Sequence, residues 1–190
     1  MATPAVELSS LERTLGLKGV FWLKLLTLLL ERDVTAVTND AIATLVPVLQ
    51  TNNAPCLEGL TTIASHLVKA AKKEELLGTT PEQCAVVQQW LEYRVIQVDS
   101  CTTQDDKKII LKDLSCYLED KVYLAGNSFT LADIMLYNGL HPIVAALTHE
   151  DREKYVNVSR WFNHIQHYPG VRQHSAAIIF VRNRLYPNVH

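Results

Sequence analysis

The sequence contains little that could form a metal or redox centre. Its four cysteines lie far apart and none belongs to a C-x-x-C pair, which argues against a zinc knuckle or a redox pair and suits a reducing compartment. His164 and His167 form an H-x-x-H pattern on an expected helix, but zinc would require His at i and i+4 or a third well-placed ligand. We therefore predict no metal site and no cofactor.

Strong charge of one sign and a long apolar run are absent as well. The formal net charge of the 190 residues is −2 and no basic stripe stands out, so we expect no direct contact with nucleic acid. The most apolar stretch, from Val20 to Leu30, is too short to span a bilayer and is interrupted by Lys24. The first residues lack the layout of a secretory signal. These features predict a soluble protein of the cytosol with no membrane partner.

Motifs of several large enzyme classes are missing too. The chain has no phosphate-binding P-loop, no dinucleotide fingerprint and no G-x-S-x-G nucleophile elbow. Cys56 follows Pro55, but no nearby His or basic residue is placed to activate its thiol. We interpret Cys56 as a loop thiol and predict no catalytic residue.

The most informative segment that is present runs from Asn127 to Tyr137, with the sequence NSFTLADIMLY. Thr130 and Asp133 stand three residues apart, which predicts a capping box at a helix start, with Asp in the place that Glu or Gln usually takes. Phe129 before the cap and Ile134 inside the helix are placed to form a hydrophobic staple. We expect this helix to be central to a helical domain, and we interpret Asp133 as structural rather than catalytic.

The remaining patterns predict an α+β, mostly helical protein. Val46 to Gln50 has the features of a short strand entered through Pro47, and apolar residues from Leu60 to Val68 recur at helical spacing. Thr80 and Pro81 can cap and open a helix, so we place a domain boundary between residues 78 and 79. Beyond it we expect only helices, including one over roughly 150–168 and a last one over 171–185.

Several stretches of the chain resemble a known family. The segment around the capped helix resembles the corresponding helix start of glutathione-transferase-like proteins, and residues 46–69, 87–98, 111–137 and 154–185 extend the likeness. They resemble a glutathione-transferase-like family associated with eukaryotic translation elongation factor one, which provides the smallest auxiliary protein of the multi-aminoacyl-tRNA synthetase complex. The resemblance implies a degenerate thioredoxin-like half over 1–78 and an all-helical half over 79–190. Residues 18–45 do not follow the family and are interpreted as an insertion or a variant.

The resemblance raises the question of whether the protein is a transferase. Glutathione transferases present a Tyr, Ser or Cys after the first strand to stabilise the glutathione thiolate. The first forty residues contain no Tyr or Cys, and both of their serines fall inside an expected helix. Where transferases place two polar residues that hold glutathione, alignment puts Gly59 and Leu60. We predict a non-catalytic scaffold, with a glutathione-dependent transferase as the alternative and a bare helical interaction domain as a third interpretation.

The partners are also implied by the resemblance. They are the transferase-like appendages of methionyl-tRNA synthetase and of glutamyl-prolyl-tRNA synthetase, together with other components of the complex. On the expected helix over 150–168, Arg160, Asn163 and His167 lie on the side opposite the apolar residues. Arg160 matches the family's arginine at a docking face on the C-terminal helices. We predict that these three residues bind a partner.

A first docking face, similar to the dimer interface of transferases, is expected on the helix after the proline-entered strand. Its weaker candidate residues are Leu60, Ile63 and His66. The family further implies a nuclear location beside the cytosolic one, and a role in the DNA-damage response.

Overall fold

The computed structural model describes residues 48–49, 57–172 and 175–180. Strand β1 (Val48–Leu49) pairs in antiparallel fashion with β2 (Leu57–Glu58). The elements that follow are α3 (Leu60–Ala70), the 3-10 turn η1 (Glu74–Leu77), α4 (Pro81–Tyr93), the π-helical turn η2 (Arg94–Val98), α5 (Gln104–Tyr117), α6 (Leu131–Ala145), α7 (His149–Lys154) and α8 (Val156–Gln166). The predicted α+β, mostly helical composition is confirmed for this part of the chain. Pro47 and Cys56 lie outside the described residues.

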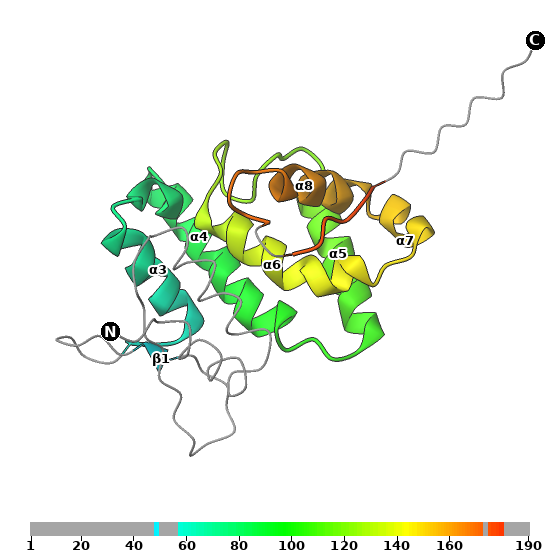
Figure 1. The fold of residues 1–190 in the computed structure, drawn as a ribbon, viewed down its shortest axis with the longest axis horizontal. Helices are drawn as coiled ribbons and strands as arrows, with labels where there is room; N and C mark the ends of the chain where they lie inside the picture. The colour runs from blue at the N-terminus through cyan, green and yellow to red at the C-terminus, as the bar shows by residue number, and fades with distance from the viewer. Residues whose placement is uncertain (1–47, 50–56, 173–174, 181–190) are drawn as a thin grey trace, which may run out of the picture.

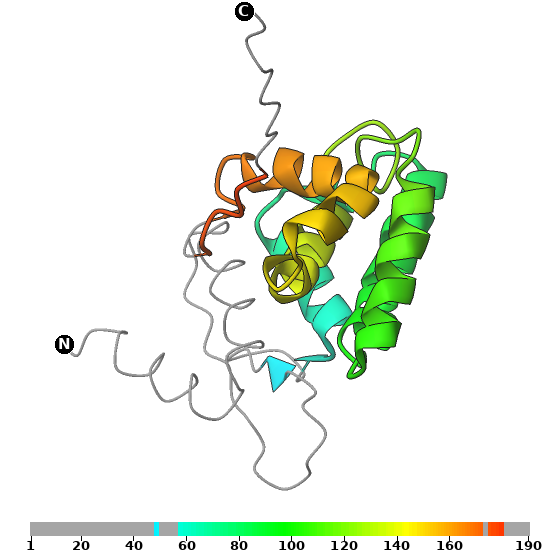
Figure 2. The same cartoon turned by 90° about the vertical axis from the view of Figure 1, so that its right-hand side faces the viewer.

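Helix α6 is the centre of the described structure. Every residue from Leu131 to Leu140 is buried, and α4, η2 and α8 all pack against the helix. Figure 2 looks roughly along α6 and shows α5 on one side of it and α8 across the top. The largest fully buried side chains, Trp161, Tyr137 and Phe162, come from α6 and α8. The prediction that the capped helix is central is confirmed.

The start of α6 is held by the buried carboxylate of Asp133. The predicted capping box with Thr130 is present, and Asp133 Oδ2 accepts the backbone N–H and the hydroxyl of Thr130 at 3.1 and 3.0 Å. Asp133 Oδ1 also accepts the Leu124 backbone N–H and the Trp161 Nε1–H, both at 3.0 Å. Asp133 therefore does more than cap its own helix, because it also ties α6 to α8 and to the preceding loop.

The start of α4 confirms the other predicted cap. Thr80 Oγ1 accepts the Gln83 backbone N–H at 3.2 Å, and Pro81 occupies the first turn, where its missing N–H costs nothing. Gln83 adds a long-range contact, since its Nε2 donates to Ala125 O at 2.9 Å. The N-terminus of α4 is thereby attached to the loop that leads into α6.

The turn η2 holds a buried arginine that the sequence patterns did not reveal. Arg94 is 3% exposed, forms an ion pair with Asp99, and donates from Nε to Met135 O at 3.2 Å. Gly139 leaves room for this guanidinium, because a Cβ at that position would lie 2.1 Å from Arg94 Nε. Regular α-helical spacing predicts Val95 on the buried face, but the wider π turn leaves it 38% exposed.

Two expected helices differ from the structure. The segment expected as one helix over 150–168 is divided into α7 and α8, because Tyr155 has φ −103° and ψ 53°, outside the helical region. The expected last helix over 171–185 is wrong for the described residues, since 175–180 have no helical structure. Their backbone groups bind side chains of α6, α7 and α8 instead, as described below. Among the residues the structure describes, no helix has the length and apolar character needed to cross a bilayer.

Candidate docking surface

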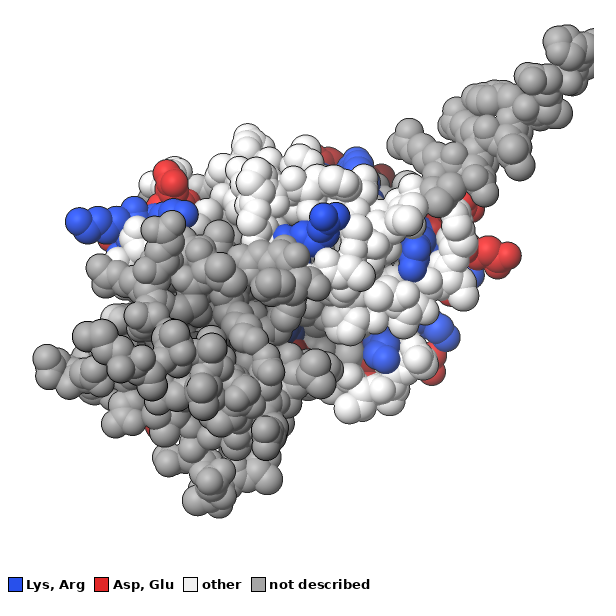
Figure 3. Space-filling model, viewed as in Figure 1, with Lys and Arg blue, Asp and Glu red and all other residues white. Residues whose placement is uncertain are grey.

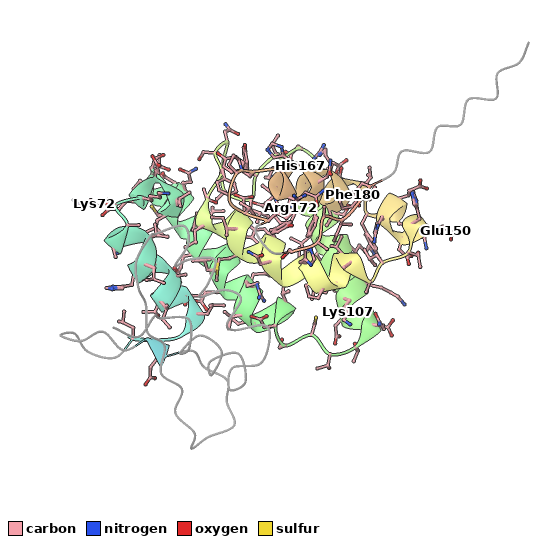
Figure 4. All side chains as sticks on the ribbon, viewed as in Figure 1. Lys72, Lys107, Glu150, His167, Arg172 and Phe180 are labelled. Carbon is pink, nitrogen blue, oxygen red and sulfur yellow. The ribbon has the colours of Figure 1, made fainter. Side chains whose placement is uncertain are left out.

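The outer side of α8 carries the three residues predicted to bind a partner. Val158, Trp161, Phe162 and Ile165 are buried on its inner side, whereas Arg160, Asn163 and His167 are exposed on the outer one. Figure 4 shows His167 at the end of α8, on the rim of the molecule. The expected division of the helix into an inner and an outer side is confirmed within α8, whereas Tyr168, which the same spacing predicts on the inner side, is 37% exposed. The three exposed residues are called the α8 face below.

Arg160 is exposed but fixed in place. Its Nη2 donates to the carbonyl oxygens of Leu118 and Lys121 at 2.6 and 3.0 Å. The Leu118 carbonyl belongs to the C-cap residue of α5 and the Lys121 carbonyl to the turn that follows, near the helix end where the helix dipole favours a cation. Nε and Nη1 of Arg160 bind no described residue and remain free to donate to another molecule. The guanidinium is thus held in one orientation, and Nε and Nη1 are left as two separate donors for acceptors on another molecule.

Asn163 and His167 are also held by hydrogen bonds within α8. Asn163 Oδ1 accepts from Gln166 Nε2 at 2.8 Å, and the His167 ring nitrogen Nδ1 lies 2.7 Å from the Asn163 backbone oxygen. These bonds limit the freedom of both exposed side chains. Less entropy is lost when such residues bind a partner than when fully flexible ones do.

Exposed apolar side chains flank Arg160. Val156 lies one turn before it on α8 and is 61% exposed, and Val122, next to the Lys121 carbonyl that Arg160 binds, is 58% exposed. Such apolar positions beside a fixed arginine are typical of interfaces between proteins.

On the described part of the side seen in Figure 3, Lys and Arg are scattered and mixed with Asp and Glu.

The weaker candidates on α3 differ in accessibility. His66 is exposed and Leu60 is partly buried, whereas Ile63 is 3% exposed and belongs to the core. The Ile63 side chain is therefore not available on the surface of this structure, so its prediction as a partner contact gains no support. His66 and part of Leu60 remain accessible.

The predicted glutathione-holding positions lie at the start of α3. Gly59 is the N-cap residue with φ 90°, a conformation that favours glycine, and Leu60 begins the helix. Gly59 has no side chain and that of Leu60 is aliphatic, so neither side chain can bind the polar γ-glutamyl group.

The two histidines of the H-x-x-H pattern have separate partners. His164 Nε2 lies 3.2 Å from the Tyr123 hydroxyl, and the ring of His167 contacts the Asn163 backbone. No group of three or more metal-binding side chains occurs among the described residues. His164 and His167 are therefore two surface histidines that contact different groups.

The chain is similar in sequence to proteins of known family. The chain is 64% identical over 145 residues to human eukaryotic translation elongation factor 1 epsilon-1, covering 76% of this chain and 83% of the human protein. The chain belongs to the elongation factor 1 epsilon-1 family. This confirms the predicted resemblance to the family associated with elongation factor one.

More distant similarities agree with the family. Residues 83–169 match a family described as nuclear-export cofactor Arc1p. Mouse bifunctional glutamate/proline–tRNA ligase is 30% identical over 105 residues, which is 55% of this chain and 7% of that enzyme. The structure superposes on a possible glutathione S-transferase from Rhodopseudomonas palustris with a TM-score of 0.62 at 21% identity, covering 80% of this chain and 90% of the other. The predicted glutathione-transferase-like fold is confirmed.

Proposed function

We propose that this protein is a non-catalytic adaptor of the multi-aminoacyl-tRNA synthetase complex, acting in translation. The proposal is supported by the family and by the similarities to an Arc1p-type cofactor and to a segment of a tRNA ligase. The observation that carries it is Arg160, an exposed guanidinium held by two carbonyls at and after the end of α5, with two nitrogens that bind no described residue. An adaptor needs a rigid surface for docking, and the α8 face has that property.

The partners that fit this proposal are methionyl-tRNA synthetase and glutamyl-prolyl-tRNA synthetase. The similarity of this chain to a segment of the second enzyme is consistent with docking between related domains. We assign the α8 face to one of the two partners. His66 and the exposed part of Leu60 are the remaining candidates for the other.

The alternative is a glutathione-dependent transferase, because structural neighbours of the protein carry that title. Leu60 at the start of α3 opposes it, since a polar ligand placed there would lose hydrogen bonds to water without replacement. Retention on a glutathione column together with conjugation of a generic electrophile would support the transferase. Adaptor activity predicts neither.

The adaptor proposal is tested by replacing Arg160 with Ala and measuring capture of both purified synthetases. We expect one of them to bind at least tenfold more weakly. Arg172→Ala is a matched control, because Arg172 is exposed on the segment after α8. Undiminished capture of both enzymes by the Arg160 variant would contradict the assignment.

A second variant separates docking from folding, because Arg160 also binds the end of α5. Val156→Asp removes an exposed apolar side chain for which the structure shows no hydrogen bond or ion pair. We expect it to weaken capture of the same synthetase while the midpoint of thermal unfolding stays unchanged.

We also propose the cytoplasm as the main location of the protein, with a nuclear pool that acts in the DNA-damage response as the family resemblance implies. Fractionation of cells before and after DNA damage tests this. A signal that stays wholly cytoplasmic in both conditions would refute the nuclear part.

A further inference from the structure

Residues 175–180, here called the strap, form an extended segment that lies against α6, α7 and α8 (red in Figure 1). The strap is held by side chains rather than by another strand. His141 Nε2 of α6 lies 3.1 Å from Ala176 O, and Arg152 Nη1 of α7 donates to Ile179 O at 3.3 Å. Ile178 is buried in the core, and Phe180, labelled in Figure 4, packs against it.

Gln166 of α8 provides the central attachment of the strap. Its Oε1 accepts the Ile178 backbone N–H at 3.2 Å, and its Nε2 donates to Ile178 O at 3.0 Å. The second hydrogen of Nε2 points to Asn163 Oδ1 at 2.8 Å. Both donors of the amide are therefore used, in a side chain that is only 3% exposed.

This network determines which way the Gln166 amide points. If the amide were turned over, its oxygen would face two acceptors, Ile178 O and Asn163 Oδ1, and its nitrogen would face the Ile178 N–H. The two hydrogen bonds with the Ile178 backbone would be lost in a buried place, which is costly, and the bond with Asn163 would survive only if Asn163 turned its amide as well. The strap thus fixes the Gln166 amide in one orientation.

The orientation of Gln166 in turn determines what Asn163 presents to solvent. Because Asn163 Oδ1 is occupied by Gln166, the opposite end of the Asn163 amide, Nδ2, is directed away from Gln166. Nδ2 binds no described residue. Together with Nε and Nη1 of Arg160, it makes this part of the α8 face a row of hydrogen-bond donors.

We propose that Gln166 is a positioning residue of the α8 face, through which the strap sets Asn163 to donate toward a partner. The inference rests on the proposed docking function and adds the chemistry of the partner. The outward donors of Arg160 and Asn163 fit carboxylate or carbonyl oxygens, so the partner presents an acidic side chain or free carbonyls opposite these two residues.

Gln166→Glu tests the coupling with an almost isosteric change. The new carboxylate still accepts the Ile178 N–H, but it cannot donate to Ile178 O or Asn163 Oδ1. Asn163 is then expected to turn its amide and donate from Nδ2 inward, which leaves Oδ1 facing an acceptor on the partner. We expect affinity for full-length glutamyl-prolyl-tRNA synthetase or methionyl-tRNA synthetase, whichever depends on Arg160, to fall about tenfold.

A double-mutant cycle with Asn163→Ala shows whether the effect passes through Asn163. In the Asn163→Ala background, Gln166→Glu should cause no further loss of affinity, because the amide that it turns is gone. An equal loss in both backgrounds would overturn the inference. The inference would also be overturned if the Gln166→Glu protein bound with wild-type affinity while Arg160→Ala weakened binding. In that case the proposed docking function would still stand. If Arg160→Ala also binds normally, the docking function itself fails.

A second pair of variants keeps the test decisive if Gln166→Glu does not fold. Ile178→Ser removes the buried side chain that holds the strap and leaves residue 166 unmutated. Ile179→Ser changes a neighbouring residue that is 73% exposed. We expect Ile178→Ser to lower affinity and to increase hydrogen exchange in the strap, and Ile179→Ser to do neither. Release of the strap with unchanged affinity would refute the coupling.

Discussion

Two helices of this protein begin with the same local motif in different surroundings. Helix α5 starts with a capping box between Thr103 and Asp106, and α6 with one between Thr130 and Asp133. Asp106 is exposed, and its hydrogen bonds with Thr103 lower the pKa of its carboxyl group below the usual value. Asp133 is buried, and removal from water raises the pKa of its carboxyl group, although hydrogen bonds from Trp161, Leu124 and Thr130 act against this.

The comparison shows what a short motif does and does not determine. In both places Thr and Asp at a spacing of three residues begin a helix. The electrostatic cost and the number of partners depend on what the fold packs around the motif. Only the buried copy connects elements far apart in the chain, since Asp133 binds Trp161, 28 residues away.

The largest expected effect comes from replacing the buried aspartate. Asp133→Asn puts an N–H₂ group where donors now point and should lower the free energy of unfolding by about 3 kcal/mol. Asp106→Asn is the matched control and should cost much less, because water replaces the lost bonds. Denaturant unfolding of both variants measures the difference. Equal losses would show that the surroundings of the motif do not matter.

A second expected effect concerns the close approach of Arg94 to α6. Gly139→Ala introduces a Cβ where the Arg94 side chain lies and should destabilise the protein by about 2 kcal/mol. The cost should shrink when Arg94 is replaced by Ala as well, since the clash is then gone. Denaturant unfolding of the two single variants and the double variant gives the interaction energy. A strictly additive result would mean that Gly139 is required for another reason.

The two aspartates should also respond to pH with opposite signs. Asp106 has a lowered folded-state pKa, so its stabilising contribution is present above the unfolded value of about 4 and is lost as pH falls through the folded pKa. Asp133 has a raised folded-state pKa, so its contribution is present below about pH 4 and is lost as pH rises through the folded pKa.

Unfolding measured against pH can separate these contributions. The stability gap between wild type and Asp106→Asn should vanish in acid. The gap between wild type and Asp133→Asn should be largest below about pH 4 and should narrow as pH rises. Parallel curves for the two gaps would contradict this.

The smallest expected effect is a gain of stability at the end of α3. Lys72 has φ 58°, in the left-handed region that favours glycine, and follows the C-cap residue Ala71. Lys72→Gly should therefore raise the free energy of unfolding by about 0.5 kcal/mol. Ala71→Gly, at a position with right-handed helical angles, should lower it. Thermal unfolding of the two variants checks the opposite signs.

Local patterns predicted the helix starts and the inner and outer sides of α8, because caps and helical periodicity depend on residues three or four positions apart. Thr80, Thr130 and the exposed position of Arg160 are examples. The same patterns predicted a last helix where the strap lies, because apolar residues there recur at spacings that suit a helix. Competition from the side chains of Gln166, Arg152 and His141 cannot be seen in the sequence.

The candidate docking surface likewise combines features that local sequence predicts with features that it does not. The exposed position of Arg160 follows from helical spacing, but its anchoring on Leu118 and Lys121 does not, since those residues lie about forty positions away. Ile63 is predicted as a weaker candidate for the first docking face, with Leu60 and His66 on the same helix, and in the structure its side chain is buried in the core. A signal for Gln166 was also absent, because a glutamine on an amphipathic helix usually faces water.

Sequence patterns alone predict where most helices begin, which residues of α8 are exposed, and to which family the chain belongs. Each depends on neighbouring residues or on direct likeness of long stretches. The burial of Asp133, the fit of Arg94 over Gly139 and the extended course of the strap become visible only in the folded protein. Burial and hydrogen bonding to distant backbone groups cannot be predicted from neighbouring residues, because they depend on which segments the completed fold brings together.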